Sequence, residues 1–350
     1  MRVITTKLAT PEIQQYIEVL PYSTSFHDDW NAVVATSSSG TFLHKREYME
    51  YHSHRFDECS VMVRYKGDFI AVFPACRTNE VEINSYAGLT YGGLLWKYGL
   101  HSDIVLEILT AVAQYYAKTG AKSMIYKSVP HIYRIHPDEA DLYWLWKQNA
   151  VLQHRQLSSA FRLNHQGNSA LPYNNLRKRK MQKGQQAQLR FREAENRDEW
   201  ADFWQHLSHE LWTNHQKIVV HTLDEILLLK NRFPEQIHLY IATEENATDG
   251  DPFLAGMVIY ETDQVIHSQY IMVSDKGRDN GALDFVTDQV FRLYSNKVAT
   301  EDGVCWFDFG ISSEGDGTPL TRGLLFQKEG FGARSLCYDT YEINLETLVL

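Results

Sequence analysis

The chain of 350 residues contains no long hydrophobic run and only four cysteines. No stretch approaches the roughly 18 consecutive apolar residues of a membrane-spanning helix, and the first residues lack the apolar core of a signal peptide. The cysteines are far apart, form no C-x-x-C pair and mostly fall in expected strands, so we expect buried, reduced thiols. These absences predict a cytoplasmic protein without a membrane span.

Several signatures of catalysis and metal binding are also missing. The sequence has no P-loop, no dinucleotide fingerprint, no G-x-S-x-G elbow and no H-E-x-x-H zinc motif. His206 and His209 share an expected helix face but lack a carboxylate at metal-site spacing, so no metal site is predicted. The 34 basic and 44 acidic residues give a net charge of −10, which argues against DNA binding and leaves room only for a local basic site.

The most informative pattern is one order of elements that occurs twice. Three strands rich in β-branched and aromatic residues are followed by a loop, an amphipathic helix and a buried strand. In the first half these strands and the helix are expected at 60–65, 69–76, 81–86, 103–118 and 123–128. In the second half they are expected at 237–243, 254–260, 265–273, 281–295 and 304–309. Matching elements lie about 180 residues apart, which predicts two copies of one β-β-β-loop-α-β unit.

A polar stretch that contains glycine and proline, residues 164–172, is expected to join the two copies. It predicts an N-terminal domain over 1–165 and a C-terminal domain over 166–350. Each domain is expected to be of the α+β class, with a mixed, mainly antiparallel sheet flanked by helices.

A loop with two glycines, 274–282, lies between an expected strand and an expected helix. Glycines let backbone N–H groups approach an anion, a helix start adds partial positive charge, and Lys276 and Arg278 add formal charge. The residues assigned to donor binding are Lys276, Gly277, Arg278, Asn280, Gly281 and Ala282. The same spacing is equally compatible with a plain turn that contains a left-handed glycine.

Polar residues interrupt two apolar strands of the second copy. His267 and Gln269 share one face of the third strand, and Tyr270 lies on the other. Asp308 lies near the end of the strand that runs beside it. An imidazole can accept the proton of an attacking amine, and a carboxylate at a strand end can orient the substrate or act as a base. The alternatives are a hydrogen-bonded structural histidine and a carboxylate that caps the next turn.

A basic run stands out in this acidic chain, with Arg177, Lys178, Arg179, Lys180 and Lys183 close together. A phosphate-rich ligand, either a nucleotide-linked substrate or the acceptor arm of an RNA, would be attracted to it. The other interpretation is a solvated helix face beside the linker, and the sequence favours neither.

A Lys-Glu pair, Lys328 and Glu329, is expected in a helix that begins near Pro319. Apolar residues at Leu320 and Leu324 predict a stripe around the pair, so both side chains are expected to serve the interior. A buried pair of this kind needs hydrogen bonds that offset its desolvation.

The element order and six short motifs resemble the GNAT acyltransferase fold, in the tandem arrangement of the Fem-type peptidyltransferases and the GNAT-family acetyltransferases related to them. The motifs are GLTYGG at 88–93, HSQY at 267–270, GRDNGALD at 277–284, FDFGISSE at 307–314, GLLFQKEGFG at 323–332 and YDTYE at 338–342. The resemblance covers nearly the whole chain and implies two tandem GNAT-like domains. Arg278 and Gly281 match the GNAT pyrophosphate signature, whereas Leu283 departs from its last position.

The resemblance implies an acyl or aminoacyl transferase that acts on an amino group of a cell-envelope peptide or polysaccharide precursor, as in peptidoglycan synthesis. Acyl-coenzyme A or aminoacyl-tRNA is the implied co-substrate, a nucleotide-linked precursor is the implied partner, and no permanently bound cofactor is expected. The candidate catalytic residues remain His267 and Asp308, argued from the strands above. The residues assigned to substrate binding are Tyr91, Gln269, Tyr270, Lys328 and the basic run. The alternative is a catalytically silent double-GNAT protein that binds a nucleotide-linked ligand or a partner protein.

Overall fold

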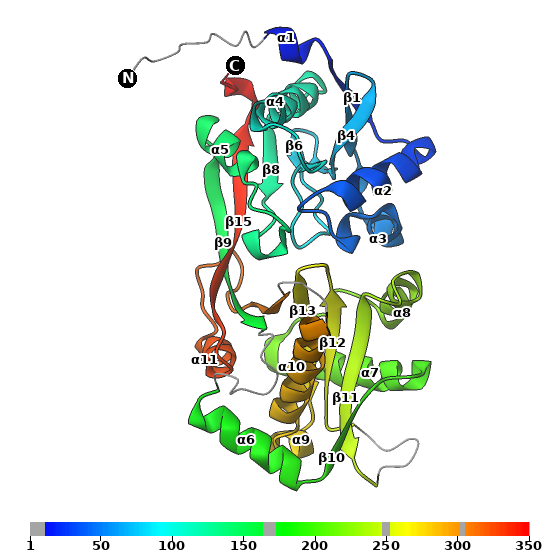
Figure 1. Cartoon of the computed structure of the whole chain (residues 1–350), viewed down its shortest axis with the longest axis vertical. Helices are drawn as coiled ribbons and strands as arrows, with labels where there is room; N and C mark the ends of the chain where they lie inside the picture. Colours follow the sequence, from blue (N-terminus) through cyan, green and yellow to red (C-terminus); the bar gives the residue numbers. More distant parts are fainter. Residues whose placement is uncertain (1–10, 164–172, 247–252, 301–304, 350) are drawn as a thin grey trace. The chain divides into compact units, whose positions relative to one another are not determined.

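The computed structural model describes residues 11–163, 173–246, 253–300 and 305–349, and Figure 1 shows its course. The expected linker at 164–172 lies outside these ranges. The chain divides into two compact units: unit 1 comprises Met1–Arg155 and Tyr338–Leu350, and unit 2 comprises Gln156–Cys337. The expected ranges, 1–165 and 166–350, remain a proposal for the two repeats, because the compact units assign the end of the chain to unit 1.

Unit 1 contains two sheets and the helices that cover them. Its α-helices are α1 (Pro11–Gln14), α2 (His27–Thr36), α3 (Arg46–Met49), α4 (Ser102–Lys118) and α5 (Ala140–Lys147). Its strands are β1 (Ile17–Pro21), β2 (Asp57–Glu58), β3 (Val61–Tyr65), β4 (Asp68–Phe73), β5 (Cys76–Asn79), β6 (Glu82–Asn84), β7 (Leu95–Trp96) and β8 (Ser123–Lys127). The strands β9 (Val151–Leu163) and β15 (Arg334–Asn344) each contribute residues to both units.

The expected crossover of unit 1 is confirmed. The strand β6 precedes α4 in the sequence, β8 follows it, and the two strands pair in parallel. The expected meander is wrong in one respect. The sheet β1-β3-β4-β7 is antiparallel, but β5 and β6 form a separate hairpin beside β8. Pro74 follows the last residue of β4; it has no N–H and a fixed φ, so the β3–β4 ladder ends there.

The core of unit 1 is built on α4. Val105, Ile108, Leu109 and Val112 recur at helical spacing on its buried face and pack with residues of β3, β4 and β8. Ile343 of β15 is fully buried in the same cluster. The end of the chain therefore completes a core whose other residues lie far away in the sequence.

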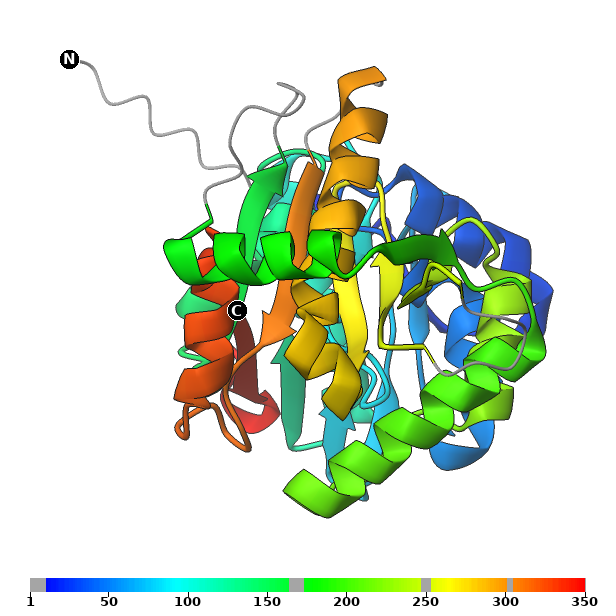
Figure 2. The same cartoon turned by 90° about the horizontal axis from the view of Figure 1, so that it is seen from below.

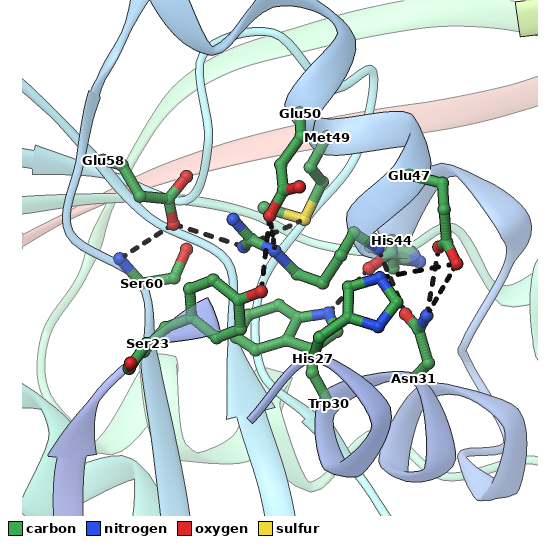
Figure 3. A network of polar contacts seen from close by, with 12 residues as sticks. Ser23, His27, Trp30, Asn31, His44, Glu47, Met49, Glu50, Glu58 and Ser60 are labelled. Atoms are coloured by element: carbon green, nitrogen blue, oxygen red, sulfur yellow. Dashed lines mark hydrogen bonds and ion pairs between the residues drawn. The ribbon is translucent and has the colours of Figure 1, made fainter. Parts of the chain in front are cut away.

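A buried arginine joins the first helices of unit 1 to its strands. The side chain of Arg46 is 2 % exposed, and its guanidinium donates to Glu50 and Glu58. The same group lies 3.7 Å from the centre of the Tyr22 ring, a cation–π contact. In Figure 3, dashed lines mark the contacts that Glu50 and Glu58, from two different segments, make with this guanidinium. This network fixes α3 against β2.

Unit 2 follows the predicted order. Its α-helices are α6 (Asn175–Gln186), α7 (Arg197–His215), α8 (Leu223–Arg232), α9 (Asp275–Asn280), α10 (Ala282–Thr300) and α11 (Arg322–Gly330). Its strands, besides its part of β9, are β10 (Leu189–Glu193), β11 (Ile237–Glu244), β12 (Ala255–Glu261), β13 (Val265–Val273) and β14 (Cys305–Ile311). The sheet order is β10-β11-β12-β13-β14-β9, antiparallel except for the parallel pair β13–β14.

Helices cover both faces of the unit 2 sheet. Val286, Val290 and Phe291 of α10 pack on one face, together with Met257 of β12. On the opposite face, Gly256 faces Phe203 of α7, as the alternation of side chains along β12 requires. Figures 1 and 2 show α6 lying across α10, which it meets at Gly184.

The segment expected as a loop at 274–282 is the short helix α9 and its caps. Ser274 is the N-cap, and its hydroxyl accepts a hydrogen bond from the backbone N–H of Gly277. Gly281 is the C-cap with φ 73°, a left-handed conformation that favours glycine. The sequence contained both caps, Ser274 and Gly281, but the two glycines led to the prediction of a loop instead of a short helix.

Two further expectations concern thiols and membranes. All four cysteines are free; Cys76 and Cys305 are buried, Cys59 is half-buried, and Cys337 is exposed, contrary to the expectation of burial. Within the described ranges, no helix combines the length and apolar composition that crossing a membrane requires.

Candidate functional site

The parallel ladder between β13 and β14 is short and ends at two polar residues. It pairs Val265–His267 with Trp306–Asp308, and His267 lies opposite Asp308. On the other side of β13, Ser268 pairs with Ile259 and Tyr270 with Val258, which leaves Gln269 as an extra residue. A bulge of this kind bends its strand. The paired section of β13 and β14 therefore stops at the candidate catalytic residues.

The structure brings His267 and Asp308 into direct contact. Nδ1 of His267 lies 3.1 Å from Oδ2 of Asp308, and the exposed fractions of the two side chains are 15% and 0%. An ionised carboxylate can only accept hydrogen bonds, so this contact favours the tautomer with the proton on Nδ1, in which Nε2 is the acceptor. A strand-end carboxylate and an imidazole in this arrangement can take a proton from a nucleophile and stabilise the resulting positive charge.

Asp308 also accepts hydrogen bonds from two donors that the sequence interpretation missed. The hydroxyl of Ser158 donates to Oδ1 at 2.6 Å, and the backbone N–H of Gly310 donates to the same oxygen at 2.9 Å. Ser158 belongs to β9, which is far from β14 in the sequence and lies beside it only because the two strands pair in the sheet. No local pattern in the sequence links it to Asp308.

Lys328 lies close to this pair and is buried, as expected. Its ammonium donates to the carbonyl oxygens of Gly310 at 2.7 Å and Ile311 at 2.8 Å. Burial lowers the pKa of Lys328 to about 8, although the charge of Asp308 opposes this shift. The expectation for Glu329 is wrong: it is exposed, because α11 buries Lys328 and Gly330, whereas the expected stripe at Leu320 and Leu324 is itself exposed.

The residues assigned to donor binding lie on α9 and at its end. Lys276 forms an ion pair with Glu244 at 2.7 Å, and Arg278 forms one with Glu210. Both cations are exposed, Asn280 is half-buried, and Ala282 is fully buried.

The two glycines of this segment are needed for close packing. A Cβ atom on Gly277 would lie 2.0 Å from the carbonyl oxygen of Leu254, and one on Gly281 would lie 2.3 Å from that of Lys180. The N–H of Gly277 donates to Ser274, and the N–H of Gly281 donates to the carbonyl of Gly277. These two N–H groups are therefore hydrogen-bonded within the segment itself.

The basic run divides into one buried and several exposed cations on α6. Arg177 is buried and forms an ion pair with Asp284, with 2.8 Å between Nη1 and Oδ1. Lys178, Arg179 and Lys180 are exposed. The amphipathic character of α6 thus separates Arg177 from the residues that a dissolved phosphate can reach.

The remaining substrate-binding candidates have different surroundings. Gln269 is the extra residue of the β13 bulge. The hydroxyl of Tyr270 lies 2.6 Å from Nδ1 of His221, and burial raises the pKa of Tyr270 to about 12. Tyr91 belongs to unit 1, where it is buried with its ring centre 4.5 Å from that of Tyr133.

A pocket of about 580 Å³ lies between α7 and the end of β13. Its lining includes His206, His209, Ser274 and Arg278, so it adjoins the segment assigned to donor binding. Although two histidines line it, the described part of the chain holds no group of His, Cys, Asp and Glu that could bind a metal ion.

A scan against protein-family models finds no match, and a search of curated proteins finds none either. Solved structures, in contrast, share the fold over nearly the whole chain. FemX aligns with a TM-score of 0.67 at 10% identity, over 94% of this chain and 98% of that one. A tandem GNAT protein from the clavulanic acid biosynthesis pathway aligns with a TM-score of 0.52 at 8% identity, over 94% and 98%. L-PGS from Bacillus licheniformis aligns with a TM-score of 0.55 at 11% identity, over 91% of each chain.

These similarities establish the fold. The chain is an α+β protein that shares its fold with FemX and with a tandem GNAT protein, and the expected fold class is confirmed. At such low identities the similarity does not extend to substrates, so the function has to be argued from the site itself.

Proposed function

We propose that unit 2 transfers an acyl or aminoacyl group to an amino group of a cell-envelope peptide or polysaccharide precursor. The donor is acyl-coenzyme A or aminoacyl-tRNA. The observation that carries the proposal is the His267–Asp308 pair, which lies where the pairing of β13 and β14 ends. The shared architecture with FemX and a tandem GNAT protein supports this class of reaction.

His267 acts as the general base in this proposal. The amine nitrogen of the acceptor forms a bond to the carbonyl carbon of the donor, and Nε2 of His267 takes the proton that the amine loses. The charge of Asp308 stabilises the imidazolium, since the two side chains are in contact. When the tetrahedral intermediate collapses, the carbon–sulfur or carbon–oxygen bond of the donor breaks, and the leaving group receives the same proton.

Two groups near the pair can stabilise the developing oxyanion. Gln269 is the extra residue of a bulge, and the backbone of such a residue is left out of the regular ladder. Its N–H is our candidate for polarising the donor carbonyl. Lys328 adds a buried positive charge next to Asp308. Both groups belong to the substrate-binding set that the sequence analysis assigned.

The pocket beside α9 is our candidate for the donor. Arg278 lines this pocket, and Lys276 lies on the same short helix. Phosphates of the donor would compete with Glu210 and Glu244 for these two cations. Lys178, Arg179 and Lys180 are proposed to attract the more distant phosphates of a nucleotide-linked precursor or a tRNA. Both donors are cytoplasmic molecules, so we place the reaction in the cytoplasm.

One observation favours a second candidate function, a catalytically silent protein that binds a nucleotide-linked ligand or a partner protein. The glycine N–H groups of the 277–281 segment donate within that segment, and its two cations are ion-paired. A donor pyrophosphate thus finds no preformed backbone cradle there. In this alternative, a ligand would bind without being transformed.

A ligand panel separates the candidates. Acetyl-coenzyme A, nucleotide-linked muropeptides and charged tRNA are added singly and in pairs to the purified protein, and thermal unfolding is recorded. A ligand at a hundred times its dissociation constant adds about 2.7 kcal/mol of stability. Mass spectrometry of the paired mixtures then detects an acylated acceptor. Binding without any acylated product supports the silent protein, and a product identifies the donor.

Replacing His267 tests its role as the base. The variant His267→Ala is expected to lower turnover by about 10² to 10⁴ while donor binding stays nearly unchanged. The matched control is His238→Ala, because His238 also contacts a carboxylate, Glu193 Oε1 at 2.8 Å, but on β11. Steady-state kinetics and thermal unfolding of both variants are the measurements. Near-normal turnover of His267→Ala would make His267 a structural residue.

A further inference from the structure

Ser158 occupies a fixed place on the far side of Asp308 from His267. Its side chain is fully buried in β9, and its hydroxyl donates to Oδ1 of Asp308 at 2.6 Å. His267 contacts the other oxygen, Oδ2. The two contacts therefore use different oxygens of a single carboxylate, with the serine at one end and the imidazole at the other.

The backbone around this contact has an irregular register. Asp308 pairs with Ala160 and Ile311 pairs with Ser158, so the ladder between β14 and β9 shifts between these two pairs. Gly310, within the shift, has φ 74°, a conformation that residues with a Cβ atom rarely adopt. This local distortion turns the N–H of Gly310 back to Oδ1 of Asp308.

Oδ1 thus receives two donors from two strands, Ser158 and Gly310. The torsion that turns an aspartate carboxylate has a broad, roughly two-fold preference, so sterics alone hold its orientation only weakly. Two hydrogen bonds on one oxygen restrict that rotation and direct the other oxygen towards Nδ1 of His267. Without the Ser158 hydroxyl, Oδ1 loses one of these two donors, so the carboxylate is held less firmly and its contact with Nδ1 weakens.

We propose that Ser158 is a positioning residue, whose hydroxyl holds the Asp308 carboxylate in the orientation that keeps the proton of His267 on Nδ1 and leaves Nε2 as the basic nitrogen. The catalytic consequence rests on the proposed function. The structural consequence, the tautomer of a single imidazole, does not depend on it. In this role Ser158 acts only through its hydrogen bond, and it forms or breaks no covalent bond.

Ser159 provides a control at the next position of the same strand. It is also fully buried, and its hydroxyl has no hydrogen-bond partner among the described residues. Ser159→Ala removes the same atom as Ser158→Ala, at the same depth, without touching Asp308. Because a buried hydroxyl without a partner is unfavourable, Ser159→Ala is expected to leave stability unchanged or to raise it.

The decisive measurement is long-range ¹H–¹⁵N NMR of the histidine rings in the full-length protein without ligand. Spectra are recorded at a pH at which the imidazoles are neutral, and His267→Ala identifies the His267 signals by their loss. The wild type and Ser159→Ala are expected to show His267 with the proton on Nδ1. Ser158→Ala is expected to show a mixture that includes the form with the proton on Nε2. Ser158→Cys, with a weak S–H donor, is expected to lie between them.

Kinetics add a second readout once a donor is identified. Ser158→Ala is expected to lower turnover by about ten- to a hundredfold, and Ser159→Ala to leave it unchanged. An unchanged His267 tautomer in both Ser158→Ala and Ser158→Cys would overturn the proposal. So would a wild-type His267 that carries its proton on Nε2. A shifted tautomer in a protein that transfers no acyl group would support the positioning role and reject the proposed function.

Discussion

At the scale of single residues, each unit uses a lysine to satisfy backbone carbonyl groups near a strand end. Lys328 donates to Gly310 and Ile311, and Lys127 donates to the carbonyls of Tyr86, Ala87 and Leu89. Burial lowers the pKa of both ammonium groups to about 8. An ammonium has three donors and suits a cluster of carbonyl oxygens, but its desolvation is costly while it is charged.

The burial of Lys328 makes stability depend on pH. Its pKa falls from 10.5 in the unfolded chain to about 8 in the native protein, so the unfolded chain binds more protons between these values. The native protein therefore gains stability relative to Lys328→Met as the pH rises from about 8 to 10.5, by about 3 kcal/mol in total. Urea unfolding of both proteins across this range measures the difference. A difference that does not change with pH would contradict the assignment.

Arg177 illustrates the cost of separating a buried ion pair. Arg177→Met leaves the buried carboxylate of Asp284 without its partner, so we expect a loss of about 3 to 5 kcal/mol of stability. The neighbouring exposed Lys178 is the control, and Lys178→Met should change stability by less than about 0.5 kcal/mol. Denaturant unfolding measures both. Similar losses for the two variants would show that burial does not distinguish them.

At the scale of elements, α6 packs closely against the α9–α10 segment at two glycines. Gly184 of α6 lies so close to α10 that a Cβ atom there would be 2.7 Å from Cβ of Phe285. A Cβ atom on Gly281 would lie still closer, 2.3 Å from the carbonyl oxygen of Lys180. Small residues at these crossings let the helix backbones approach each other, which explains glycines that the sequence alone suggested for anion binding.

Alanine at Gly281 is expected to destabilise the protein by about 2 kcal/mol or more. The left-handed φ costs about 1 to 2 kcal/mol for a residue with a Cβ atom, and the contact with Lys180 adds to this. The matched control is Gly323→Ala in α11, where an added Cβ atom meets nothing within 4 Å. That variant should be neutral or stabilised by up to about 1 kcal/mol. Thermal and urea unfolding test whether the two substitutions differ in sign.

At the scale of the whole molecule, β15, near the end of the chain, contributes to the core of unit 1. β15 pairs with β8 over five residue pairs, from Thr340–Lys127 to Asn344–Ser123. Ile343 lies in the core of unit 1 and is fully buried. Unit 1 therefore cannot complete its core until the end of the chain is available.

Ile343→Ala is expected to destabilise unit 1 by about 2 to 5 kcal/mol, since it removes a fully buried side chain from that core. Hydrogen exchange should report faster exchange of the amides of α4 and β8, with those of β11 and β12 unchanged. Val349→Ala, at a position that is 39% exposed, is the control and should change neither set. Equal acceleration in both units would show that they unfold as one.

Local signals in the sequence determined most of the elements. Runs rich in β-branched and aromatic residues predicted β11, β12 and β13, the amphipathic pattern predicted α4 and α10, and their order predicted the two crossovers. His267 and Asp308 could be named because a polar residue inside an apolar strand is unusual and needs a partner. Fold class and catalytic candidates are thus both properties of short stretches of the chain.

The tertiary structure alone decided which residues surround those candidates. Ser158 reaches Asp308 because β9 pairs with β14, and Arg177 is buried because α6 packs on α10. The end of the chain joins unit 1 because β15 pairs with β8. Each of these contacts joins segments that are far apart in the sequence, and such contacts depend on the sum of weak interactions over the whole fold. Local periodicity does not reveal these long-range interactions, so it predicts the helices and strands but not which of them pack together.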